Sequence, residues 1–210
     1  TLSGSTYKTN AATYASAAGD KILLTKGSAV TFTTSDDAIA FNTGNIKLSD
    51  GSDLSVTTAG GAISAVAIYG TSSEDVTLSS ISGTTNTVSV GTVGSADQIN
   101  TVAISGSSGI TLSGNIVTSD ASGNTVTIAG PVTLGGAVSI DTDTTTNDGA
   151  ISFSSTIDGA QTLAISSGSA NTSVAGAIGG TTKSSSFSIP TANDVSLQAV
   201  TTAASGTITL

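Results

Sequence analysis

The stretch Gly109-Ile-Thr-Leu112 has a counterpart at Pro131-Val-Thr-Leu134 and a related run at Gly149-Ala-Ile-Ser-Phe153. Apolar side chains alternate with Ser or Thr in each run, so one face of a strand would be buried and the other would carry hydroxyls. Gly-Gly and Ser-Gly turns separate these runs from others of the same kind. The other runs are Ala29–Thr33, Asp75–Leu78, Asn124–Ile128, Phe187–Ile189, Asp194–Leu197 and Gly206–Leu210. The pattern predicts short strands along most of the chain.

The spacing of these strands indicates how they are arranged. Leu112 and Leu134 are 22 positions apart, and Leu134 and Phe153 are 19 apart. A period of about 20–25 residues is the length of one solenoid coil. We therefore predict an all-β parallel β-helix, a β-solenoid in which coils stack on one aliphatic core and Leu134 points inward. A β-sandwich also has many short strands, but the chain holds few aromatic residues to fill a core between two sheets.

Two regions are expected along the chain. Residues 29–210 carry the strand pattern and are assigned to the solenoid. Residues 1–28 are assigned to an N-terminal cap or interaction segment, because the part from Thr6 to Ala18 is rich in Ala, contains Tyr7 and Tyr14, and lacks the repeat. A short helix is an alternative for this segment. A cap is the preferred interpretation, since an exposed terminal coil needs covering.

The composition excludes several functional classes. The 210 residues include 5 Lys, 14 acidic residues and no Cys or His, and the net charge is −9. Disulfides and thiolate sites are excluded, and the commonest general base and metal ligand is missing. Five Lys residues spread along the chain cannot form a phosphate-binding stripe, so no nucleic-acid partner is expected. No apolar run approaches the ~18 residues of a membrane span, and none is predicted.

The same composition favours an extracellular protein. Charged residues make up only 9% of the chain, whereas Ser and Thr together number 73. Hydroxyls would then solvate a surface that has little charge, as in many secreted bacterial surface proteins. The chain has no initiator Met and no signal peptide, which suggests a processed subunit or a segment of a longer chain.

Part of the chain resembles a known group of bacterial exoproteins. The segments Gly149–Ile165 and Ser173–Thr182 are similar to the repeats of filamentous-haemagglutinin-like adhesins, and the tail Asn193–Thr202 continues in the same style. The resemblance implies a right-handed parallel β-helix that is exported across the cell envelope. It also implies a role as a stalk, fibre or adhesin at the bacterial cell surface. It supplies no catalytic residues.

One segment has the composition of a calcium loop. In Asp141-Thr-Asp-Thr-Thr-Thr-Asn-Asp-Gly149, the side chains of Asp141, Asp143, Asn147 and Asp148 supply hard oxygen ligands, and Gly149 permits a sharp turn. The alternative is an exposed loop in which Asp and Asn favour turn geometry. Calcium is thus a possible ligand, and no other cofactor is expected. Weaker acidic candidates are Asp36, Asp37, Asp50 and Asp53.

Catalysis is not expected from this chain. Polysaccharide-cleaving β-helices pair carboxylates in a cleft, and their sugar platforms are usually aromatic, but the only aromatic residues here are three Tyr and four Phe. The Phe residues lie in alternating strands and are predicted to be core. A carbohydrate-binding or carbohydrate-cleaving β-helix is kept as an alternative, which predicts clustered Asp and exposed Tyr in a groove. Asn171 begins one N-glycosylation sequon.

We therefore predict a non-enzymatic extracellular structural protein that forms or extends a surface fibre. The expected partner is a second copy of the chain, stacked end to end as a homopolymer. A host-surface or matrix glycan is a second possible partner, and a surface-layer protein is a further alternative. Residues predicted to take part in self-association are Thr1, Tyr7, Tyr14, Ile208 and Leu210.

Overall fold

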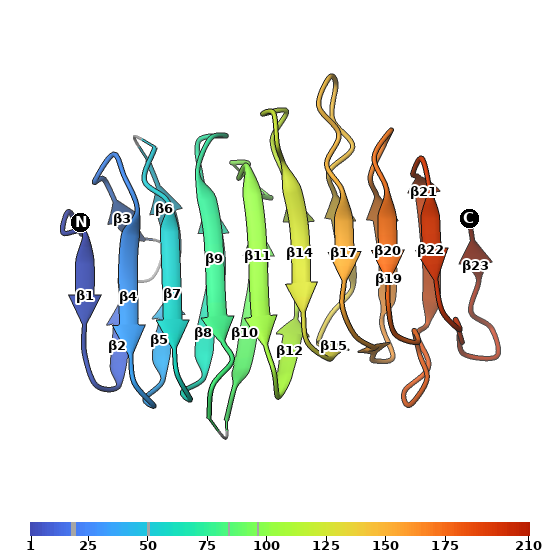
Figure 1. Ribbon diagram of the computed structural model, residues 1–210, viewed down its shortest axis with the longest axis horizontal. Helices are drawn as coiled ribbons and strands as arrows, with labels where there is room; N and C mark the ends of the chain where they lie inside the picture. The colour runs from blue at the N-terminus through green and yellow to red at the C-terminus, as the bar shows by residue number, and fades with distance from the viewer. Residues whose placement is uncertain (18–19, 50, 84, 96) are drawn as a thin grey trace.

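The chain folds into a β-solenoid of about eight turns. The computed structural model describes residues 1–17, 20–49, 51–83, 85–95 and 97–210, so the candidate Asp50 lies outside the described residues. All regular elements in these ranges are strands, and all paired strands are parallel. In Figure 1 the front strands run downward and the chain returns behind them while it advances from left to right, which makes the solenoid right-handed. The predicted fold class is confirmed.

The front wall of the solenoid is a nine-stranded parallel sheet, with one strand from each coil. Its strands are β1 (Thr6–Lys8), β4 (Val30–Thr34), β7 (Leu54–Thr58), β9 (Asp75–Ser80), β11 (Thr101–Gly106), β14 (Thr125–Ala129), β17 (Ile151–Phe153), β20 (Thr172–Val174) and β22 (Val195–Leu197).

The remaining fourteen strands form one bent sheet that closes the coil behind the front wall. The long strands β8 (Ile63–Tyr69) and β10 (Thr87–Val93) each pair with two successive strands of a neighbouring coil, so they join the two halves of this sheet. The other strands are β2 (Ala12–Ala15), β3 (Lys21–Leu24), β5 (Ile39–Thr43), β6 (Asn45–Leu48), β12 (Gly109–Leu112), β13 (Ile116–Val117), β15 (Val132–Leu134), β16 (Val138–Asp141), β18 (Ile157–Asp158), β19 (Thr162–Ser166), β21 (Ser186–Thr191) and β23 (Ile208–Thr209).

The register of the strands sets the coil length. Partners in the front wall are between 21 positions apart, as for Ile151 and Thr172, and 26 apart, as for Val76 and Val102. Leu112 pairs with Leu134 as the 22-residue spacing predicted. The 19-residue spacing from Leu134 to Phe153 was misread. Phe153 lies in the front wall beside Ile128, whereas Leu134 lies in the rear sheet, because strands on different sides of a coil share one alternating pattern.

The core consists of columns of apolar side chains that run the length of the solenoid. In one column of the front wall, every residue pairs in register with the next. Its members are Tyr7, Phe32, Val56, Leu78, Ile104, Ile128, Phe153, Val174 and Leu197. All four Phe residues are buried, and Leu134 is 4% exposed, so both predictions about the core are confirmed. Burial of such columns is the main favourable term in a repeat fold.

The N-terminal segment differs from its prediction in one respect. Residues 1–28 contain β1, β2 and β3, which pair in parallel with β4, β5 and β6. The segment is therefore the first coil of the solenoid, and the expected break in the repeat and the alternative of a short helix are both wrong. The pattern was hidden because Tyr7 and Ala12 of the first coil are in register with Phe32 and Ile39 of the second. Whether this coil also serves as a cap stays a prediction.

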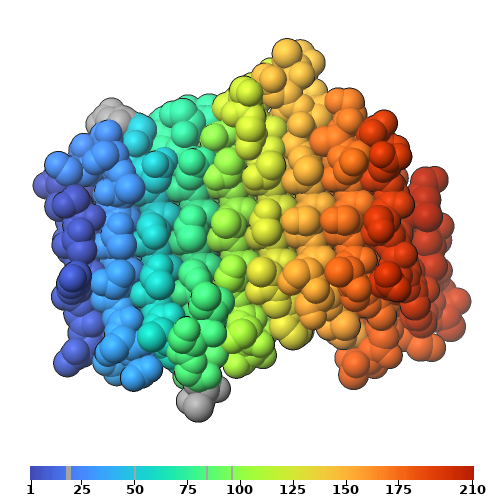
Figure 2. All heavy atoms as spheres, viewed as in Figure 1, coloured from blue at the N-terminus to red at the C-terminus, as the bar shows by residue number. Residues whose placement is uncertain are grey.

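The outward face of the front wall is lined with hydroxyl side chains. The outward position of successive strands is occupied by Thr6, Thr31, Ser55, Thr77, Ala103, Thr127, Ser152, Ser173 and Ser196, which are in register with one another. Figure 2 shows this face, where side chains form rows along the long axis. Small hydroxyls stack at the strand spacing of about 4.8 Å without repulsion, so they solvate a wall that has few charges.

Candidate functional site

The predicted calcium loop lies between β16 and β17 and projects beyond the neighbouring loops (Figure 1). Its carboxylates accept hydrogen bonds from protein groups. Asp148 Oδ1 accepts from the Thr144 backbone N–H at 2.8 Å, and its Oδ2 accepts from the Ser169 backbone N–H at 2.6 Å. Asp141 Oδ1 accepts from the Asp143 N–H at 3.0 Å. Within the described ranges, no three His, Cys, Asp or Glu side chains are grouped as metal ligands. The geometry gives the calcium prediction no support.

The residue that organises this loop is Asp120, which sequence reasoning missed. Its Oδ1 accepts from the backbone N–H groups of Thr146 at 2.9 Å and Asn147 at 2.7 Å, and from Thr144 Oγ1 at 2.8 Å. The side-chain amide of Asn147 donates in return to the Asp120 carbonyl at 2.9 Å. The donors lie in the coil after Asp120, 24 to 27 residues further along the chain. The contact could therefore be predicted only if the register between the two coils were known. One carboxylate thereby closes a projecting loop through backbone amides.

The same arrangement recurs along the solenoid, and we call each instance a coil brace. In a coil brace, a side-chain oxygen of one coil accepts from a backbone N–H of the next coil toward the C-terminus. Asp53 Oδ1 accepts from the N–H of Asp75 at 2.9 Å, and Asp75 Oδ1 accepts from that of Thr101 at 3.1 Å. Asp158 Oδ1 accepts from the N–H of Thr181 at 2.7 Å. Bonds to an ionised acceptor are stronger than neutral ones. Coil braces therefore give several Asp side chains hydrogen-bond donors in a chain that has few cations.

The coil braces of Asp120 and Asp148 lower the pKa values of these two carboxylates. The backbone N–H of Asn147 lowers the pKa of Asp120, and Thr144 and Thr146 contribute further hydrogen bonds. The backbone and side-chain donors of Ser169 lower the pKa of Asp148. In both cases the charged form is stabilised by donors that point at it. These carboxylates are therefore held ionised in the folded state.

Acid is expected to destabilise the solenoid through these groups. A pKa that is lower in the folded than in the unfolded chain contributes stability above the unfolded value, about 3.9 for Asp, and this stability is lost as the pH falls through the lowered folded value. Urea unfolding of the wild type followed between neutral pH and about pH 2.5 should show a marked loss of stability below about pH 4. The double variant Asp120→Asn and Asp148→Asn should lose less stability over the same range. An identical acid dependence in the two proteins would show that these coil braces are not responsible.

Glu74 is the only Glu in the chain, and it is fully buried. Its carboxylate accepts from the Thr71 backbone N–H at 2.6 Å, from the Thr71 hydroxyl and from the Ser73 N–H at 3.3 Å. Burial raises the pKa of Glu74, but these hydrogen bonds together lower it below the ordinary value. The carboxylate closes a tight turn in which Ser72 has a φ of +100°. Because no part of Glu74 is exposed, a substrate in solution cannot reach it.

The aromatic residues near the N-terminus do not form an exposed platform. The ring of Tyr7 stacks on Phe32 with centroids 4.9 Å apart, and the ring of Tyr14 stacks on Phe41 at 5.3 Å. Both Tyr side chains are half-buried, and both pack against the apolar core of the solenoid. The groove with exposed Tyr that the carbohydrate alternative predicts is therefore not formed by these residues.

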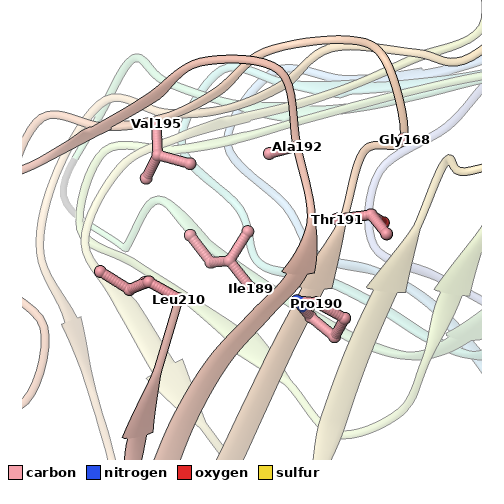
Figure 3. A pocket seen from close by; sticks show the side chains of 7 residues that line it. All are labelled: Gly168, Ile189, Pro190, Thr191, Ala192, Val195 and Leu210. Carbon is pink, nitrogen blue, oxygen red and sulfur yellow. The ribbon is translucent and has the colours of Figure 1, made fainter.

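A hollow of about 370 Å³ lies at the C-terminal end of the solenoid (Figure 3). It is lined by Gly168, Ile189, Pro190, Thr191, Ala192, Val195 and Leu210. Leu210 is 73% exposed, and nearby Ile208 is 48% exposed, as expected for two residues predicted to take part in self-association. The lining side chains include no carboxylate, amine or imidazole, so their chemistry suits an apolar contact better than a reaction.

A second hollow, of about 190 Å³, lies at the N-terminal end. Thr1 and Tyr14, two other residues predicted to self-associate, line it together with Leu2 and Lys21. The structure thus separates the five predicted residues between the two ends of the solenoid. At each end the last side chains of the core columns are only partly buried, among them Tyr7 at the N-terminal end and Leu197 at the C-terminal end.

The remaining candidates are distributed over the surface. Asp36 is exposed and Asp37 is partly exposed, in the turn after β4. Asn171 is exposed, and its Oδ1 accepts from the Asp194 N–H at 3.2 Å, so the sequon residue takes part in a coil brace. Its glycosylation stays a prediction.

Comparisons with known proteins leave the family open. No family model, no curated protein and no solved structure matches this chain. In the described ranges, no helix is long and apolar enough to cross a membrane. The functional argument therefore depends on the geometry of the solenoid itself.

Proposed function

We propose that this chain is a non-enzymatic structural protein, a stiff solenoid that forms or extends a fibre on the bacterial cell surface. The observation that carries the proposal is the continuous register of the nine-stranded front wall. A rod built in this way resists bending, because every coil between the ends is hydrogen-bonded to two neighbours and shares a core with them.

The use of the polar residues supports a mechanical role. Asp120, Asp148 and Asp158 hold backbone amides of the next coil, and Glu74 closes a turn. Catalytic carboxylates need a cleft and a substrate that reaches them. In this chain the carboxylates of Asp120, Asp148 and Asp158 connect coils, which is what a rod under tension requires.

The surface location is proposed from the resemblance to filamentous-haemagglutinin-like repeats and from the hydroxyl-covered wall. A Ser and Thr surface stays hydrated with little charge, which suits a fibre exposed to variable salt. The carbohydrate-binding and surface-layer alternatives share the same scaffold. No contact in the described residues favours either of them over a fibre.

Immunoelectron microscopy of intact, unpermeabilised cells tests this proposal. Antibodies raised against the folded chain should label filaments or stalks that extend from the outer surface. Labelling that appears only after permeabilisation would contradict it. Incubation of the purified chain with neutral and acidic polysaccharides should release no reducing ends, and sustained release would favour the carbohydrate alternative.

A further inference from the structure

We infer that the C-terminal end of one copy binds the N-terminal end of another, so that the solenoid grows head to tail with a fixed polarity. This inference rests on the proposed fibre function and specifies its partner, a second copy of this chain. Three observations on the two end surfaces carry it: the match of their core columns, the direction of the coil braces and the opposite charge.

The first observation is the match of the core columns. Leu197 ends the column that Tyr7 begins, and both side chains are partly buried. Val200 likewise ends the column that Ala12 begins, through an unbroken series of paired residues. A second copy placed one strand spacing beyond the last coil would therefore continue both columns and cover the hollow beside Leu210.

The second observation is the direction of the coil braces. Asp53, Asp75 and Asn171 stand at the same register position of the front wall, the first two in consecutive coils and Asn171 four coils after Asp75, and each side chain accepts from the N–H of its register partner in the next coil. Asp194 stands at this position in the last coil. It is exposed, and its carboxylate is an acceptor for a further coil.

The N-terminal end has the matching donor. Counted along the register, Gly4 occupies in the first coil the position that Asp53 occupies two coils later. Its exposed N–H donates to the phenol oxygen of Tyr7 at 2.9 Å. In a head-to-tail contact the Asp194 carboxylate replaces this phenol as the acceptor. An ionised acceptor makes the stronger bond.

The third observation is charge. Residues 1–28, the first coil, hold three Lys and one Asp, a formal charge of +2, whereas residues 193–210, the last coil, hold one Asp and no Lys, a formal charge of −1. The first coil is therefore attracted to the C-terminal end of another copy. Two C-terminal ends would repel each other, as would two N-terminal ends.

Sedimentation velocity of the full chain over a range of concentrations tests the inference. The wild type should form progressively longer oligomers. Leu210→Asp, at the C-terminal end, and Ala12→Asp, at the N-terminal end, should each weaken association by at least about tenfold. Val66 is a matched control, because it is 50% exposed on the side of the rod, and Val66→Asp should associate like the wild type. Far-UV circular dichroism of each variant verifies that it is folded.

A mixture of the two end variants determines the polarity. Each variant retains one intact end, so a head-to-tail contact predicts that the mixture forms dimers and nothing larger. Dimers of either variant alone would show a contact between like ends and would overturn the inference, as would a wild type that stays monomeric throughout. Labelled surface fibres together with a monomeric purified chain would leave the proposed function standing and refute only this contact.

Discussion

Leu134→Asp is expected to lower the free energy of unfolding by about 3–5 kcal/mol. Leu134 lies in β15 with 4% of its surface exposed, and its register partner is Leu112 in the preceding coil. The substitution removes apolar contacts and places a carboxylate among aliphatic columns that offer it no cation. Burying an uncompensated charge, or protonating it to avoid that cost, is unfavourable in either case. Urea unfolding monitored by far-UV circular dichroism at neutral pH measures the loss.

The matched control is Thr127→Asp. Thr127 is exposed on the front wall between Ala103 and Ser152, so a new carboxylate there meets water and no like charge in its row. The expected change in unfolding free energy is within about 0.5 kcal/mol, as for most surface substitutions. Equal and small effects of the two variants would mean that Leu134 does not face the core.

The fold could be predicted largely from alternation and spacing. The runs ending at Leu112 and Leu134 are nearly identical, and they proved to be neighbours in the rear sheet. Phe153 could not be placed by the same reasoning, because the front and rear strands of a coil share one pattern of apolar and hydroxyl residues. The first coil was missed for a related reason. Tyr7 and Tyr14 stand in register with Phe32 and Phe41, and only the pairing of β1 with β4 and of β2 with β5 reveals them as core positions.

The candidate sites were harder to predict than the fold. Composition singled out Asp141–Asp148 as a group of oxygen ligands, yet the residue that holds this loop is Asp120, whose donors lie 24 to 27 residues further on. In a coil brace the acceptor side chain and the donor N–H belong to different coils, and they become neighbours only when the two coils stack in the correct register. Local sequence therefore shows which side chains can accept hydrogen bonds. The stacking of the coils decides which backbone N–H groups donate to them.

The second large effect is expected from Gly94→Ala. Gly94 has a φ of +70°, and a Cβ placed on it would lie 2.0 Å from the carbonyl oxygen of Val117 in the next coil. Coils stack about 4.8 Å apart, so neither backbone can move away without breaking the ladder on both sides. The left-handed conformation costs an L-residue about 1 kcal/mol, and overpacking adds about 1–3 kcal/mol. The free energy of unfolding should fall by about 3 kcal/mol, measured by urea unfolding.

Gly51→Ala separates the two contributions, because Gly51 has nearly the same φ, +71°, with no described atom within 4 Å of the position of its Cβ. This control variant should lose only the conformational part, about 1 kcal/mol. The difference between the two variants therefore measures how tightly adjacent coils approach at the Gly94 corner. Equal losses would mean that the coils yield there, and the stiffness proposed for the rod would then lack its physical basis. A loss at Gly94 that clearly exceeds the loss at Gly51 would mean that even one methyl group cannot be fitted between coils, which is the rigidity that a fibre needs.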